Sequence, residues 1–117
     1  MNLNSILIGS EDPKPLVEYY TKLFGEPTWN DAGYTGWQIG AGGITVGPHS
    51  EVKGKNETPG RVIWNIESTE VKRDFDRLKE AGAKVEHDLY NPGEETEMWI
   101  ATFSDPDGNF FQLVSPM

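Results

Sequence analysis

The sequence contains no cysteine and only two histidines among its 117 residues. Without cysteine, the chain has no disulfide bond, no thiolate nucleophile and no cysteine-based zinc site. Basic residues are also few: 10 Lys and Arg stand against 19 Asp and Glu, which gives a formal net charge of −9. An acidic surface repels the phosphates of nucleic acids and of anionic membranes, so we expect neither as a partner.

Long hydrophobic runs are missing as well. No apolar segment approaches the length of about 18 residues that a membrane-spanning helix needs, and residues 1–4 lack the basic start of a secretory signal. The hydrophobic share is 36%, with 4 Trp, 5 Phe and 4 Tyr, which is enough to build a folded core. We therefore expect a cytoplasmic protein with a single domain over residues 1–117.

The order of predicted elements is the same in both halves of the chain. Each half reads as a strand, an amphipathic helix and three further strands, and the two helices end at Gly25 and Gly82. Pro13 begins the first helix after a capping Asp12, and Ser68 or Thr69 caps the second. The predicted strands cover residues 3–8, 28–30, 36–39, 43–46, 61–67, 84–88, 97–103 and 109–114. The sequence thus predicts an α+β protein of two βαβββ modules, about 1–57 and 58–117, that share a sheet-based core.

The most distinctive motif is DPDGN at residues 105–109, which predicts a tight turn that opens the last strand. It occurs together with Glu-Asp before the first helix, Leu-Phe-Gly at its end, and the run RLKEAGA at residues 77–83. In this order and spacing, the motifs make the whole chain resemble the glyoxalase/bleomycin resistance protein/dioxygenase superfamily, also called the vicinal oxygen chelate superfamily. The resemblance implies two βαβββ modules whose mixed sheets curl, like an open barrel, around a cup. It also implies a homodimer.

The resemblance further implies a divalent metal held by four inward-facing side chains, mostly His, Glu or Gln. Counted from the shared motifs, these positions fall on Ser5, Ile63, Gln112 and either Thr45 or Gly47. A hard cation needs several oxygen or nitrogen donors, but Ile63 has none and Ser5 is a poor ligand. We therefore expect no metal and no other cofactor, and metal-dependent chemistry is the alternative.

Strand alternation predicts which side chains line the cup. Most are apolar, with a few neutral polar groups, a combination typical of a small-molecule pocket. Two tryptophans in central strands are candidate walls for a flat ligand. The predicted ligand-binding residues are Ser5, Leu7, Trp37, Ile63, Asn65, Trp99, Phe110 and Gln112. The alternatives are that the amides only satisfy other polar groups and that the tryptophans only fill the core.

Two residues are candidates for acid–base catalysis, His49 at the end of a strand and Glu67 further along the face of the cup. An exposed loop histidine is the alternative for His49, and His87 reads as a strand-edge residue in phase with Val85. The acidic loop Glu94–Glu97 is either a solvated loop or a cover of the cup mouth.

Three functions follow from these observations. The first is a small-molecule-binding protein of the sequestering or resistance type that lacks the usual metal site. The second is a lyase, isomerase or dioxygenase that uses an atypical metal site or acid–base residues. The third is a protein-interaction module with a vestigial cup. The sequence leaves the ligand and the arrangement of the dimer open.

Overall fold

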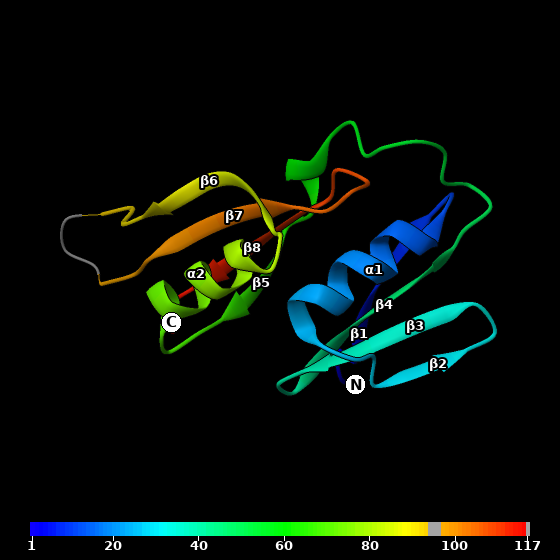
Figure 1. Cartoon of the computed structure of the whole chain (residues 1–117), viewed down its shortest axis with the longest axis horizontal. Coiled ribbons are helices and arrows are strands. Elements are labelled where there is room, and N and C mark those ends of the chain that lie inside the picture. The colour runs from blue at the N-terminus through cyan, green and yellow to red at the C-terminus, as the bar shows by residue number, and fades with distance from the viewer. Residues whose placement is uncertain (94–96, 117) are drawn as a thin grey trace. The chain divides into compact units, whose positions relative to one another are not determined.

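A computed structural model of the chain describes residues 1–93 and 97–116. The chain divides into two compact units, Met1–Lys55 and Asn56–Met117. Each unit contains one α-helix and a four-stranded mixed sheet, and neither sheet closes into a barrel. The predicted α+β class and the repeated βαβββ order are therefore confirmed (Figure 1).

The first unit has its strands in the order β1-β4-β3-β2. β1 runs parallel to β4, and the remaining pairs are antiparallel. Because β1 and β4 are parallel neighbours, the chain must cross over between them, and helix α1 begins that crossover. The elements are β1 (Ser5–Ser10), α1 (Pro13–Phe24), β2 (Trp29–Asp31), β3 (Tyr34–Ile39) and β4 (Gly42–Pro48).

The second unit repeats this topology with the order β5-β8-β7-β6. β5 is parallel to β8, and the other two pairs are antiparallel. A short 3₁₀ turn, η1 (Pro59–Arg61), precedes the sheet. The other elements are β5 (Trp64–Glu67), α2 (Val71–Glu80), β6 (Lys84–Tyr90), β7 (Ile100–Ser104) and β8 (Phe110–Val114). No helix in the described ranges is long and apolar enough to span a membrane.

The helix starts differ from the predicted caps. Pro13 is the first residue of α1, as predicted, but the Asp12 side chain makes no capping hydrogen bond. The backbone N–H of Asp12 instead donates to Ser10 Oγ at 3.2 Å. The N-cap of α2 is Glu70, and the predicted cap Ser68 supports it by accepting a hydrogen bond from the Glu70 N–H at 3.0 Å.

The predicted strand over residues 61–67 is also shorter than expected. Pro59 and Gly60 form the 3₁₀ turn, in which the Arg61 N–H donates to the Thr58 carbonyl at 3.0 Å. Because Arg61 is used in this turn, β5 begins only at Trp64.

Each helix packs on one face of its own sheet (Figure 1). In the first unit, Tyr20 of α1 meets Trp37 of β3 edge to face, with ring centroids 6.0 Å apart. In the second unit, Phe75 of α2 lies 5.7 Å from the ring of Phe103 in β7, which in turn stacks on Phe111 at 5.2 Å. Both cores therefore lie between a helix and the inward-facing residues of a sheet, as strand alternation predicts.

Candidate ligand-binding faces

The face of each sheet that lies opposite its helix carries most of the predicted site residues. We call these the α1-distal face, on β1-β4-β3-β2, and the α2-distal face, on β5-β8-β7-β6. In β1, Ile8 is buried beneath α1 whereas the side chain of Leu7, on the α1-distal face, is 54% exposed. Since large apolar side chains are rarely so exposed without a reason, Leu7 marks this face as a candidate binding surface.

One row of paired residues crosses all four strands of the α1-distal face. Leu7 pairs with Thr45, Thr45 with Gly36, and Gly36 with Trp29. The indole of Trp29 covers Gly36 so closely that a Cβ atom at Gly36 would overlap its Nε1 and Cε2 atoms. The sequence analysis missed Trp29 as a site residue. The available signal was a glycine inside a neighbouring strand, which often marks the close approach of another group.

The corresponding row on the α2-distal face is polar. Asn65 pairs with Gln112, Gln112 with Thr102, and Thr102 with His87. Gln112 Nε2 donates to Thr102 Oγ1 at 3.2 Å. The structure therefore brings together the two predicted amide residues and adds Thr102, which the sequence analysis did not single out.

His87 is placed on this face by an irregularity in β6. Its register with β7 shifts between Val85, which pairs with Phe103, and His87, which pairs with Thr102. Phe103 and Thr102 point to opposite faces of the sheet. The prediction that His87 shares the phase of Val85 is therefore wrong, because a bulge changes the alternation.

The strand register also identifies the fourth family position. Leu7 lies two residues after Ser5 and pairs with Thr45, and Asn65 lies two residues after Ile63 and pairs with Gln112. Thr45 is therefore the counterpart of Gln112 in the first unit. The other candidate, Gly47, lies beneath the ring of Tyr34, which occupies the space of a side chain at that position.

The residues at the four family positions do not fit a hard divalent cation. They supply two hydroxyl groups, one amide and one aliphatic side chain: Ser5, Thr45, Gln112 and Ile63. Such a cation prefers anionic oxygen or imidazole donors, and this set contains neither. Within residues 1–93 and 97–116, no three His, Asp or Glu side chains come together in a group that could hold a metal.

The predicted tryptophan walls lie on the helix side of their sheets. Trp37 is 2% exposed, and its Nε1 donates to the Gly25 carbonyl at 2.9 Å. Trp99 is half-buried, with the Lys72 ammonium of α2 4.8 Å from its ring centroid. Both placements favour the packing alternative, so neither residue enters the ligand proposal below.

The remaining predicted residues flank the polar row of the second unit. Ile63 is half-buried just before β5, and Phe110 is half-buried at the start of β8. Glu67 is exposed at the end of β5, opposite Val114. Residues 94–96 of the acidic loop lie outside the described residues, and Glu97 is exposed.

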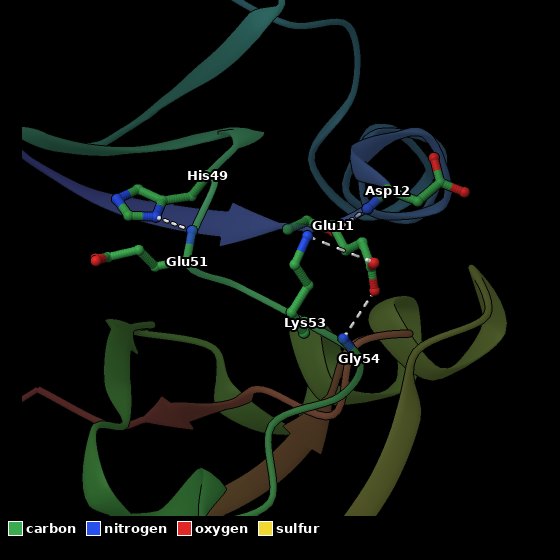
Figure 2. A network of polar contacts seen from close by, with 7 residues as sticks. Glu11, Asp12, His49, Glu51, Lys53 and Gly54 are labelled. Carbon is green, nitrogen blue, oxygen red and sulfur yellow. Dashed lines mark hydrogen bonds and ion pairs between the residues drawn. The ribbon is translucent and has the colours of Figure 1, made fainter.

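His49 belongs to a polar network at the end of the first unit (Figure 2). Its Nδ1 accepts a hydrogen bond from the Glu51 backbone N–H at 3.2 Å, so the proton of the neutral ring lies on Nε2. In the same network, Glu11 accepts from the Gly54 N–H at 2.9 Å and lies 3.9 Å from Lys53 Nζ. A general base needs an available ring nitrogen, and this arrangement leaves His49 a donor instead.

A family model described as a glyoxalase-like domain matches residues 5–114. The chain therefore belongs to the glyoxalase-like domain family. A search of curated proteins finds no match.

Solved structures show the same fold over nearly the whole chain. A glyoxalase/bleomycin resistance protein/dioxygenase family enzyme from Burkholderia phytofirmans PsJN is 19% identical, with a TM-score of 0.73 over 100% of both chains. TioX from Micromonospora sp. ML1 is 16% identical, with a TM-score of 0.73 over 100% of both chains. A glyoxalase-related enzyme from Fulvimarina pelagi is 18% identical, with a TM-score of 0.74 over 98% of this chain and 88% of that one. At these identities the likeness establishes the fold alone.

Proposed function

We propose that this protein binds a small organic molecule on its helix-distal sheet faces, without a metal at the family positions and without chemical turnover. The observation that carries the proposal is the neutrality of the two matched positions in each unit. Leu7 and Thr45 occupy them in the first unit, and Asn65 and Gln112 occupy them in the second. Apolar surface combined with a few neutral hydrogen-bonding groups suits the binding of an uncharged organic ligand.

The absence of turnover rests on the chemistry of the two catalytic candidates. The acceptor nitrogen of His49 is already used by the Glu51 N–H. Glu67 is exposed to solvent, where a carboxylate keeps the weak basicity of a hydrated group. Neither residue is therefore prepared for proton transfer, which favours binding over catalysis.

Native mass spectrometry of untagged protein, purified without a chelator, tests the proposal. We expect a metal-free protein, and a bound organic mass would identify the ligand. Titration with Zn²⁺, Mn²⁺ and Ni²⁺ should give no stoichiometric complex for the unmodified chain or for Gln112→Ala. One divalent ion per chain that is lost in Gln112→Ala would overturn the proposal, as would a bound organic mass that changes during incubation.

We propose a homodimer as the working form, in line with the superfamily resemblance. Each four-stranded sheet ends in two edge strands, and exposed edges favour pairing with another chain or coverage by it. Sedimentation at micromolar concentration should give twice the chain mass of 13.1 kDa. A species at the chain mass alone would contradict this part of the proposal. A cytoplasmic location likewise stays a prediction.

A further inference from the structure

We propose that Trp29 is a stacking platform, and that the α1-distal face takes an uncharged planar aromatic molecule of one or two fused rings. This inference rests on the proposed binding function and names its ligand class. Trp29 lies outside the set of residues that the sequence predicted.

Trp29 is held in place before any ligand arrives. Its indole rests on Gly36, where the missing side chain leaves room for it. The preceding residue, Thr28, is tied to β3 twice: its N–H donates to the Gly36 carbonyl at 2.8 Å, and its Oγ1 accepts from the Gln38 N–H at 2.8 Å. A ligand that stacks on a fixed ring does not have to order it, which favours binding.

Trp29 nevertheless remains accessible. Its side chain is 46% exposed, although it is one of the largest apolar groups in the unit. On the same row of the sheet, Leu7 is also exposed, and Thr45 lies between the two strands that carry Gly36 and Leu7. The face therefore offers an aromatic surface, an aliphatic surface and a hydroxyl group in one line.

A pocket beside Trp29 limits the size of the ligand. Its volume is about 180 Å³, and its lining includes Ser5, Gln38, Gly43 and Thr45. Pockets for drug-sized ligands are larger, about 300–1,000 Å³. The pocket therefore suits one or two fused rings, with the Ser5 and Thr45 hydroxyls placed to meet a polar substituent.

The charge of the pocket selects among ligands of this size. None of the described residues that line it is charged. A charged ligand would lose hydration there without gaining an opposite charge, and the net charge of −9 adds a general repulsion of anions. These two effects favour a neutral molecule.

Four probes of similar size test the inference: 2-naphthol, which is planar and neutral; decahydro-2-naphthol, which is neutral but not planar; 2-naphthoate; and N-methylquinolinium. Binding is followed by isothermal titration and by the indole N–H resonance of Trp29, assigned with Trp29→Phe. We expect 2-naphthol to bind tightest and to shift that resonance. Trp29→Ala should weaken its binding about tenfold, and Trp29→Phe should weaken it less.

Gly36→Ala provides a test that keeps the tryptophan but moves it. A methyl group at Gly36 occupies the place of the indole, so we expect a loss of 2-naphthol binding similar to that in Trp29→Ala. Gly60→Ala is the matched control, because nothing lies within 4 Å of a Cβ atom there. Circular dichroism melts of all variants verify that they fold, and Trp29→Phe keeps the test valid if Gly36→Ala does not.

Several results would overturn the inference. Equal binding of 2-naphthol by Trp29→Ala and the unmodified chain would do so, as would decahydro-2-naphthol or a charged probe binding at least as tightly. Conversion of a dimer to a monomer in Trp29→Ala with unchanged probe binding would show that a second copy covers the ring. If no probe binds but an organic mass copurifies, the ligand class is wrong while the binding function stands. If no probe binds and no mass copurifies, both proposals fail.

Discussion

The side chain of Glu86 shows how one hydrogen bond changes the acid–base behaviour of a residue in the second unit. The Ser104 hydroxyl donates to Glu86 Oε1 at 2.7 Å and lowers the pKa of Glu86 below its usual value, partial burial opposes this effect, and Lys84 lowers the pKa further. Because the folded pKa is lowered, the stabilisation is present above the pKa of the unfolded chain. It is lost as the pH falls through the folded pKa.

We therefore expect Ser104→Ala to lower the free energy of unfolding by about 1 kcal/mol at neutral pH. The difference from the unmodified chain should shrink as the pH falls through the pKa of Glu86. Urea unfolding at neutral and acidic pH measures both values, and Glu86→Gln serves as a control that cannot titrate. A difference that stays the same at every pH would mean that the Ser104–Glu86 bond does not stabilise the charged form.

Asp105 supports the turn of the DPDGN motif from a buried position. Its Oδ1 accepts from the backbone N–H groups of Asp107 and Asn109, both at 2.9 Å, and its Oδ2 accepts from the Asn109 side-chain amide at 3.0 Å. Asp105→Ala leaves these donors without their partner, so we expect a loss of about 2–3 kcal/mol in the free energy of unfolding. Urea unfolding measures it.

The matched control is Asp76→Ala on the exposed side of α2. Its effect should stay within about 0.5 kcal/mol. Equal effects of the two substitutions would show that the turn does not depend on the Asp105 carboxylate.

At the scale of elements, the pairing of β3 with β4 depends on a glycine beneath an aromatic ring. A Cβ atom at Gly47 would overlap Cδ1 of Tyr34, whose hydroxyl donates to the Pro48 carbonyl at 3.2 Å. Gly47→Ala must displace the ring or the strand, so we expect a cost of about 1–3 kcal/mol. Thermal unfolding measures it, with Gly42→Ala, where a Cβ atom meets open space, as the control.

A second substitution separates the ring from the strand as the cause. In Tyr34→Ala the obstacle is gone, so adding Gly47→Ala to it should cost much less than Gly47→Ala alone. Additive effects in this double-mutant cycle would exclude the ring as the source of the strain.

Element positions were largely predictable because they depend on local pattern. The apolar spacing of Leu16, Tyr20 and Leu23 predicted α1, and these side chains are buried as expected. Strand alternation predicted that Phe111 and Leu113 would be buried under α2, and they are. Register was not predictable in the same way, because it depends on partners that are distant in the sequence. The bulge that turns His87 toward Thr102 is one example.

At the scale of the whole molecule, the connection between the units is held on both sides of Lys55. On one side, Glu11 accepts from the Gly54 N–H, as Figure 2 shows. On the other, the Asn56 N–H donates to the Asp107 carbonyl at 2.8 Å, and its side-chain amide donates to Asn109 Oδ1 at 3.0 Å. Each of these bonds lies within one unit.

We therefore expect Glu11→Ala to speed tryptic cleavage after Lys53 several-fold. Loss of the bond to Gly54 makes local opening easier, while the residues around the cleaved bond stay the same. Limited proteolysis followed by mass spectrometry measures the rate. Glu18→Ala, an exposed substitution on α1 with the same change of charge, should leave it unchanged. Equal cleavage of both variants would show that Glu11 does not restrain the connection.

The sequence by itself determined the α+β class, the repeated βαβββ order and the neutral residues at Ser5, Ile63 and Gln112. These follow from composition, periodicity and motifs, all of which act over short stretches of chain. Only the tertiary structure decided that Thr45 is the counterpart of Gln112, that Trp37 is part of the core, and that Trp29 lies exposed over Gly36. The physical reason is that strand pairing joins residues far apart in the sequence, and a shift of one residue moves a side chain to the opposite face of the sheet.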